Sequence, residues 1–292
     1  MATLRVLHLT DTHLFGDDSR HYGVVDTADH LRRTLAHVAG REFDLVVCSG
    51  DVSEDGSEAS YELARELLEP WAAERGARVV FAMGNHDRRE SFRAVLGEGQ
   101  LGVAATPLNG GLDPARPIAS VATAGGWRTI VLDTSVPGAG YGALDPAQLD
   151  ALAVELATPA EHGTILIMHH PPVPAQTDLL GALDLGDADT AALWERLAGS
   201  DVRAVLAGHY HLPVVEFVRG IPVVVAPGSA NVAAAFEDPA VESASDDFGG
   251  ATLEVSADRV RVVPFTRPVT GGDVFRMDTE TVTRIIAAAG RG

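Results

Sequence analysis

The stretch RVVFAMGNHD, residues 78–87, combines the two features of this 292-residue chain that say most about its fold. A strand is predicted over residues 78–83, because the five residues after Arg78 form an apolar run that starts with two β-branched valines. The glycine that follows opens a polar loop, as at the end of a buried strand. The same succession occurs twice earlier in the chain. Residues 4–9 form an apolar run before Asp11-Thr12-His13, and residues 45–48 form another before Gly50-Asp51.

Segments of helical character separate these predicted strands. Apolar residues at helical spacing predict a helix over residues 26–39 and a second helix over residues 57–75. A short helix is predicted over residues 88–96, with Asp87 as its N-cap and Glu90 completing a capping box. This alternation of strands and helices predicts a parallel sheet covered by helices.

The remainder of the chain is predicted to hold further strands, some of them in antiparallel pairs. The expected strands span residues 118–122, 129–132, 164–168, 202–207, 214–218, 221–226, 251–255 and 260–265. The expected helices span residues 145–156 and 190–198, with a short amphipathic segment at residues 282–289. The acidic, glycine-containing residues 237–250 are expected to form a surface loop.

These elements predict an α/β architecture in which two packed mixed β-sheets are flanked by helices, a four-layer αββα sandwich. The sequence contains no internal repeat and no stretch of linker-like composition that would divide it. We therefore expect one domain over residues 1–265 and a C-terminal extension over residues 266–292.

Composition narrows the classes of partner. The formal net charge of −19 argues against a nucleic-acid surface, because binding to a polyanion needs clustered basic residues. The sole cysteine, Cys48, lies in an apolar run, where a small buried hydrophobe is expected rather than a reactive thiol. The N-terminal residues lack the pattern of a signal peptide, and no apolar run is long enough to span a membrane. A cytoplasmic location is expected.

Five short polar blocks follow predicted strands and carry the candidate chemistry. They are Asp11-Thr12-His13, Gly50-Asp51, Gly84-Asn85-His86-Asp87, His169-His170-Pro171-Pro172 and Gly208-His209-Tyr210-His211. Loops at the carboxyl ends of strands in an α/β sheet meet at one crevice. Carboxylates, imidazoles and an amide oxygen without thiolates suit Zn, Fe, Mn or Co rather than a cysteine-based structural zinc site.

The number and spacing of these residues favour two ions over one. Asp11 and His13 are two residues apart, as are His209 and His211, so an extended backbone would point both side chains of each pair to one face. Two carboxylates, four imidazoles and one amide oxygen make seven ligands. That number is too large for one tetrahedral ion but suits two ions that share a bridging carboxylate.

The order of these blocks resembles the pattern of the calcineurin-like metallophosphoesterase superfamily, and the resemblance covers positions 11–211. Within that superfamily the chain is most similar to the bacterial class III cyclic nucleotide phosphodiesterases and the related glycerophosphodiesterases. The cues to that subgroup are GDVSEDG at residues 50–56, MHHPP at 168–172 and AGHYH at 207–211. The resemblance implies a metallo-dependent phosphatase-like fold and a metal-dependent phosphoric diester hydrolase.

The resemblance also implies roles for individual residues. It implies two divalent ions, with Fe and Mn expected first and Zn or Co also acceptable, and a metal-held hydroxide that attacks phosphorus. The implied ligands are Asp11, His13 and His211 for the first ion, Asn85, His169 and His209 for the second, and Asp51 as the bridge. His86 would contact the phosphate or protonate the departing alkoxide. His170 is a candidate supporting residue, and His21 is expected to be solvated although it lies near the site mouth.

The expected substrate is a small phosphodiester, with 3′,5′-cAMP or 2′,3′-cAMP foremost. Glycerophosphodiesters are the alternative within the same chemistry. Protein phosphatases of the superfamily place an arginine in the turn after Gly-Asp, and residues 50–55 here contain none. The acidic balance argues against a nuclease, and the complete set of ligands argues against a non-enzymatic scaffold. A homodimer is possible, and specificity is expected to lie in residues 15–25, 174–188 and 231–248.

Overall fold

The computed structural model describes residues 2–108 and 115–289. One β-sheet is formed by β1 (Leu4–Leu9), β2 (Leu45–Ser49), β3 (Arg78–Ala82), β13 (Phe248–Val255) and β14 (Val260–Arg267). The strand order is β14-β13-β1-β2-β3. The strands β1, β2 and β3 run parallel, as the alternating pattern predicted, and β13 and β14 extend the sheet in antiparallel pairing.

The second sheet contains β4 (Thr106–Pro107), β5 (Ser120–Ala124), β6 (Trp127–Val131), β7 (Gly163–Ile167), β8 (Val202–Ala207), β9 (Val214–Val218) and β10 (Ile221–Val225). Its order is β4-β5-β6-β7-β8-β10-β9. The four central strands β6, β7, β8 and β10 are parallel, and hairpins add antiparallel strands at both sides. Both sheets are therefore mixed, as predicted.

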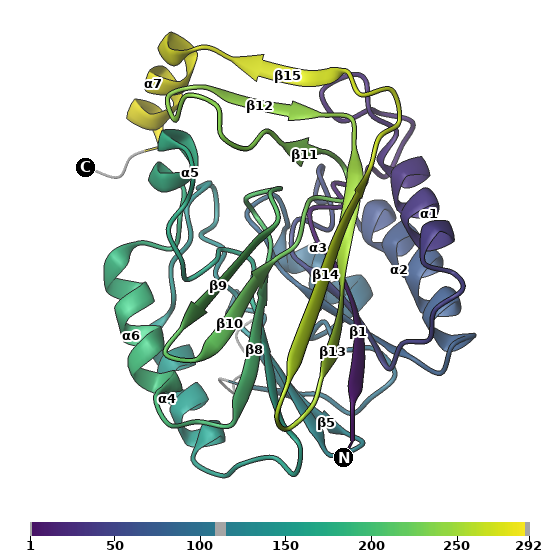
Figure 1. The fold of residues 1–292 in the computed structure, drawn as a ribbon, viewed down its shortest axis with the longest axis vertical. Helices are drawn as coiled ribbons and strands as arrows, with labels where there is room; N and C mark the ends of the chain where they lie inside the picture. The colour runs from purple at the N-terminus through teal and green to yellow at the C-terminus, as the bar shows by residue number, and fades with distance from the viewer. Residues whose placement is uncertain (1, 109–114, 290–292) are drawn as a thin grey trace.

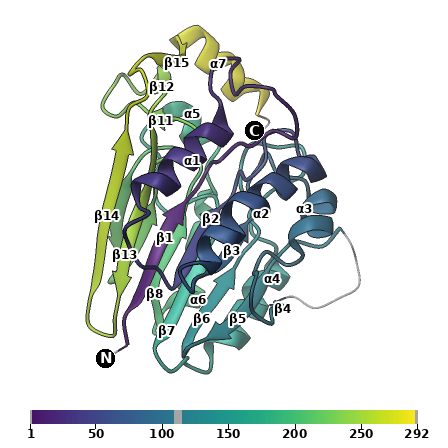
Figure 2. The same cartoon turned by 90° about the vertical axis from the view of Figure 1, so that its right-hand side faces the viewer.

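Three apolar clusters show how the layers pack. The first joins one sheet to the helices α1 (Thr27–His37), α2 (Glu58–Ala73) and α3 (Arg89–Leu96). A second joins the other sheet to α4 (Pro146–Leu156) and α6 (Asp187–Leu197). The third lies between the sheets, where side chains such as Val47 and Ile165 are fully buried. The predicted four-layer αββα sandwich is confirmed, and Figure 2 shows α1, α2 and α3 on one outer face.

The C-terminal part adds a small sheet above the strand ends, at the top of Figure 1. It consists of β11 (Val232–Ala233), β12 (Glu242–Ser245) and β15 (Asp273–Met277), in the order β11-β12-β15. The helix α7 (Thr279–Ala288) follows and contacts α5 (Asp178–Ala182). Residues 290–292 of the predicted C-terminal extension lie outside the described residues. No described helix has both the length and the apolar character needed to cross a membrane.

Residues 237–250 were expected to form a surface loop, and that expectation is wrong. They contain β12 and the start of β13, and Glu242, Ser243 and Ala244 are buried. The strand is held by backbone pairing with β15, where Glu242 lies opposite Met277 and Ala244 lies opposite Phe275. Acidic and small residues have low strand propensity, so the local sequence does not indicate a strand here. The strand is stabilised by its pairing with β15, which lies about 30 residues later in the chain.

A buried arginine ties the second sheet to its helix layer. Arg128 on β6 is 4% exposed, and its guanidinium donates hydrogen bonds to Thr164 Oγ1 at 2.8 Å and to the carbonyl of Glu155 at 2.6 Å. It also pairs with Asp201 at 2.8 Å. This one side chain therefore connects β6, β7, α4 and the turn before β8.

Replacing that arginine tests how much the connection contributes. Arg128→Met leaves the Asp201 carboxylate without its cation in a poorly solvated site, and we expect a loss of about 3–5 kcal/mol in the free energy of unfolding. Arg196→Met is the matched control, because Arg196 pairs with Asp150 at the surface and should cost about 0–1 kcal/mol. Urea unfolding of both variants measures the difference, and equal losses would contradict it.

Candidate metal centre

The five polar blocks meet at the carboxyl ends of strands from both sheets. Backbone hydrogen bonds join the loops directly: the Asp11 N–H donates to the Gly50 carbonyl at 3.0 Å, and the His13 N–H donates to the Asp51 carbonyl at 2.9 Å. The His209 N–H donates to the Asp11 carboxylate, which ties the two sheets together at this end. The loops therefore hold one another, as well as their side chains, in place.

Asp11, His13 and His211 form one compact group. One ligand atom from each lies within 4.8 Å of the other two. His211 Nε2 is 3.3 Å from Asp11 Oδ1 and 3.2 Å from His13 Nε2. These are the three residues that the resemblance assigned to the first ion, and the structure brings them together.

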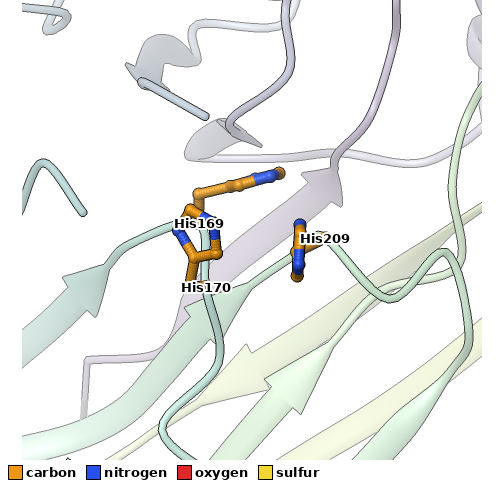
Figure 3. A group of neighbouring side chains, drawn as sticks. All are labelled: His169, His170 and His209. Atoms are coloured by element: carbon orange, nitrogen blue, oxygen red, sulfur yellow. The ribbon is translucent and has the colours of Figure 1, made fainter. Parts of the chain in front are cut away.

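A second group gathers around the amide oxygen of Asn85. Asn85 Oδ1 is 3.2 Å from His169 Nε2 and 3.1 Å from His209 Nδ1. Asp51 Oδ2 lies between the two groups, 3.3 Å from His169 Nε2 and 3.7 Å from His13 Nε2. Figure 3 shows His169 and His170 on one loop and His209 on the neighbouring loop. The position of Asp51 is the one that a bridging ligand needs.

Each imidazole of these groups is oriented by a hydrogen bond on its outer nitrogen. The Nδ1 atoms of His13, His169 and His211 contact Glu54 Oε2 at 2.6 Å, the Ser49 carbonyl at 3.0 Å and Asn231 Oδ1 at 2.9 Å. His209 is reversed, with Nε2 3.0 Å from the Leu183 carbonyl. In every case the remaining nitrogen faces the centre. Such outer hydrogen bonds fix the tautomer and orientation of metal-binding histidines.

The backbone of the centre is locally strained. Asp11, His13, Asp51, His209 and His211 all have positive φ, between 43° and 69°. Non-glycine residues seldom adopt this region, and it costs of order 1–3 kcal/mol per residue. The expectation that an extended backbone aligns each Asp-x-His or His-x-His pair is therefore wrong. Left-handed turns after the strands direct these side chains to the centre.

Two glycines are required by the closeness of the loops. Gly50 has φ of +107°, and a Cβ at this position would collide with the His169 ring. A Cβ on Gly84 would collide with the carboxylate of Asp51. The glycines of the Gly-Asp and Gly-Asn-His-Asp blocks thus allow the second group to close around Asp51.

Glu54 is a central residue that the sequence did not single out. Its Oε2 is 2.6 Å from His13 Nδ1, 3.1 Å from His86 Nδ1 and 3.5 Å from His21 Nδ1. Burial opposes its ionisation, but the hydrogen bond with His13 and the close contacts with His21 and His86 hold the pKa of Glu54 well below its ordinary value. The carboxylate therefore orients both a candidate ligand and the candidate catalytic residue. The sequence offered one indication of this role: Glu54 follows the candidate bridging residue Asp51 by three residues and so belongs to the same loop.

The environment of Asp87 differs from the predicted helix cap. The helix α3 has Arg88 at its N-cap position without a side-chain capping bond. The Asp87 carboxylate instead accepts backbone hydrogen bonds from Gly84 at 2.8 Å, Val52 at 3.2 Å and Ser53 at 3.0 Å. It therefore joins the loops after β2 and β3, which present Asp51 and Asn85.

His170 and His21 lie beside the centre in different ways. His170 is fully buried, with Nδ1 2.8 Å from Thr134 Oγ1 and Nε2 3.2 Å from the Gly140 carbonyl, so both nitrogens already have polar partners. His21 is 4% exposed and its ring stacks on that of His13 at a centroid distance of 4.6 Å. The expectation that His21 is solvated is wrong, because the small C-terminal sheet lies over this part of the site.

The donor chemistry of the centre fits divalent cations. Asp11 and Asp51 are 0% and 2% exposed, and buried carboxylates this close need positive charge to offset their repulsion. Burial opposes a charged ring at His169, but Asp51 and Asp11 raise its pKa to about 9, so the carboxylates draw a proton there. Burial lowers the pKa of His13 to about 4 and that of His209 to about 3, which keeps both rings neutral and able to coordinate. Cations bound by these residues would replace the proton.

The contacts of Glu54 generate a prediction for metal affinity. Glu54→Ala removes the acceptor that orients His13, and we expect metal affinity to fall about 10- to 100-fold, the usual effect of losing such a partner. Glu54→Gln keeps an oxygen in place and should fall less. Isothermal titration of metal-stripped protein with Mn²⁺ measures both constants. Unchanged affinity in Glu54→Ala would contradict the orienting role.

Comparisons with known proteins agree with this geometry. Residues 4–213 match the calcineurin-like phosphoesterase family. A cAMP/cGMP dual specificity phosphodiesterase of Mycobacterium tuberculosis is 44% identical over 226 residues, which are 76% of this chain and 66% of that relative. A Rhodococcus erythropolis protein named "Probable cyclic nucleotide phosphodiesterase" is 38% identical over 290 residues, 98% of this chain and 91% of the relative.

A solved structure shares the fold at much lower sequence identity. A dimetal phosphatase from Danio rerio superposes with a TM-score of 0.58 at 15% identity, covering 90% of this chain and 98% of that chain. At this identity the likeness concerns the fold alone. The sequence match spans the strands, loops and polar blocks that build the centre, and this chain therefore belongs to the calcineurin-like phosphoesterase family.

Proposed function

We propose that this chain is a binuclear-metal phosphodiesterase that hydrolyses cyclic nucleotides. The observation that carries the proposal is the convergence of six residues with oxygen or nitrogen donors around a seventh, Asp51, in a chain similar over most of its length to proteins named cyclic nucleotide phosphodiesterases. The proposed ligands are Asp11, His13 and His211 for one ion and Asn85, His169 and His209 for the other. Asp51 is the proposed bridge.

Two divalent ions, when bound, supply Lewis acidity toward the phosphate and activate water for attack on phosphorus. The residues of the chain fix where that happens. Two carboxylates and the Asn85 amide oxygen keep the ions in place, and the surrounding imidazoles face inward because their outer nitrogens are already hydrogen-bonded. His86 lies at the boundary of the cavity over these ligands and is more exposed than they are.

His86 is placed to act on the phosphate or on the leaving group. Its backbone N–H donates to Asp51 Oδ1 at 2.9 Å, and its Nδ1 contacts Glu54, so Nε2 is left for the substrate. The side chain is 38% exposed, unlike the buried ligand histidines. Burial favours the neutral ring, but the charges of Asp51 and Glu54 raise the pKa of His86 to about 10, and bound cations oppose that increase. A ring held this way can donate a proton or hydrogen bond to a departing alkoxide.

The finer features of the proposal follow from composition and surface. Fe and Mn are the proposed ions, and Zn or Co also fit a donor set of oxygen and nitrogen. The net charge of −19 supports a small-molecule substrate rather than a nucleic acid, and the single buried cysteine supports a reducing, cytoplasmic environment. The edge strand β9 exposes Phe217 (67%) and Val215 (41%), which supports pairing with a second copy of the chain.

Substitutions of Asp51 and His86 separate metal binding from catalysis. Asp51→Ala removes the bridge and should abolish most metal occupancy and turnover. His86→Ala should retain both ions but lower kcat about 10²- to 10⁴-fold, the range for an acid–base group. His37→Ala, an exposed histidine outside the centre, is the control. Metal analysis and phosphodiester hydrolysis measure the two properties, and full activity in His86→Ala would show that its assigned role is wrong.

The substrate class is tested on Mn²⁺-reconstituted protein with an EDTA-treated control. We expect metal-dependent hydrolysis of 3′,5′-cAMP or 2′,3′-cAMP at a rate near or above that of a generic aryl phosphodiester. The preferred isomer then identifies which cyclic nucleotide fits. Cleavage of glycerophosphodiesters or monoesters without cleavage of either cyclic nucleotide would contradict the proposal but keep the two-metal chemistry.

A further inference from the structure

Two cavities of very different size meet at Asn85 and His86. The smaller one, of about 150 Å³, lies beneath the C-terminal sheet and is lined by candidate metal ligands such as Asp51 and His209. The larger one, of about 850 Å³, lies between α3 and the loop that follows β6, and it contains no other candidate metal ligand. His86 therefore separates the metal centre from a much larger space.

Volume decides which cavity can accept the organic part of a substrate. Sites for small molecules usually enclose about 300–1,000 Å³. The smaller cavity is below that range, and ions and a phosphate group would fill it. The larger cavity is within the range and opens beside the residue that contacts the phosphate. A substrate whose phosphate lies at the metals can extend past His86 into this larger space, because both cavities are lined by Asn85 and His86.

The larger cavity has two facing walls of different chemistry. One wall is the loop with Val136 and Pro137, both accessible to solvent and apolar. The other is the first turns of α3, which present Arg88 and the exposed Ala94. An apolar wall opposite an arginine suits a flat aromatic group, because a guanidinium stacks on the face of a ring.

The two walls are held at a fixed separation by another arginine. Arg89 donates from Nε to Asp133 Oδ2 at 2.8 Å and from Nη2 to the Ser135 carbonyl at 2.9 Å, so it ties α3 to the start of the opposite loop. The guanidinium of Arg89 therefore donates its hydrogen bonds to groups of the protein. The cavity is shaped before any ligand binds, which lowers the ordering cost of binding.

Arg88 differs from this neighbour. Its stem packs across Gly56, where an added Cβ would collide with it, and its backbone N–H donates to Tyr61 Oη at 2.9 Å. Within residues 2–108 and 115–289 its guanidinium has no hydrogen-bond or ion-pair partner. The position of the side chain is therefore restrained, whereas its charged end is available at the cavity.

We propose that this larger cavity binds the nucleoside of the substrate, with the nucleobase between the Val136–Pro137 wall and the guanidinium of Arg88. The inference rests on the proposed cyclic nucleotide function and assigns the residues that select the base. Arg88 is a specificity-determining residue, while the phosphate remains with the metal ligands and His86.

The test compares substrates with and without a base. For Arg88→Ala, the ratio of kcat/KM for the cyclic nucleotide to that for methyl p-nitrophenyl phosphate should fall about 3- to 30-fold, the range for a lost cation–π contact. Ala94→Phe, which narrows the cavity from an exposed helix position, should lower the same ratio. Arg196→Ala and Val154→Phe alter exposed residues away from both cavities and should leave it unchanged. An equal fall for both substrates would overturn the proposal, because it would mean an effect on the phosphate or on folding.

A binding measurement separates this inference from the proposed activity. Saturation-transfer NMR of adenosine with zinc-loaded protein should show contacts to the base, and these should disappear in Ala94→Phe. Adenosine contacts that are absent, or unchanged in Ala94→Phe, would contradict the nucleoside site. Failure of the unaltered protein to cleave cyclic nucleotides would instead contradict the proposed function, whatever the adenosine result.

Discussion

Two carboxylates that lie buried and close together, Asp11 and Asp51, impose the constraint on which the rest of this structure depends. In a poorly solvated interior such charges repel each other, and they are tolerated only beside positive charge and hydrogen-bond donors. The structure surrounds them with imidazoles and backbone N–H groups. His209 and His86 each donate a backbone hydrogen bond to one of the carboxylates, at 3.1 Å and 2.9 Å. Divalent cations are the natural completion of this arrangement.

The fold supplies the rigidity that this arrangement needs. The interior between the sheets is apolar and fully buried at residues such as Val47 and Ile165, so the strands cannot slide without exposing their core faces. At the carboxyl ends of those strands, left-handed turns hold Asp11, His13, Asp51, His209 and His211 in positive φ. Strain of this kind persists where the surrounding structure determines it, and it clusters at functional sites. The hydrogen bonds of Glu54 and Asp87 then fix the loops and rings against one another.

The sequence predicts the layers and the ligand set because both depend on local pattern. Apolar runs predicted the strands β1, β2 and β3, and each run ended at a polar block whose residue types suit metals. The features that the sequence did not predict depend on long-range contacts. The strand β12 forms because β15 pairs with it, and His21 is buried because the small sheet lies over it. Asp87 was predicted to be a helix cap, because a carboxylate directly before a helix usually caps it. Its carboxylate instead accepts hydrogen bonds from the backbone N–H groups of Gly84, Val52 and Ser53.

The positions around Asp51 are proposed to hold two ions, one on each side of its carboxylate. Anomalous diffraction from crystals of the Mn²⁺-loaded protein would locate both ions. Two peaks are expected about 3.5–4 Å apart, the usual spacing in two-metal sites. One peak should touch Asp11, His13 and His211, and the other Asn85, His169 and His209, with Asp51 contacting both. A single peak would show that the chain does not bind two ions. A peak held by His13, Glu54 and His86, which also lie within 4.8 Å of one another, would show that the proposed ligand set is wrong.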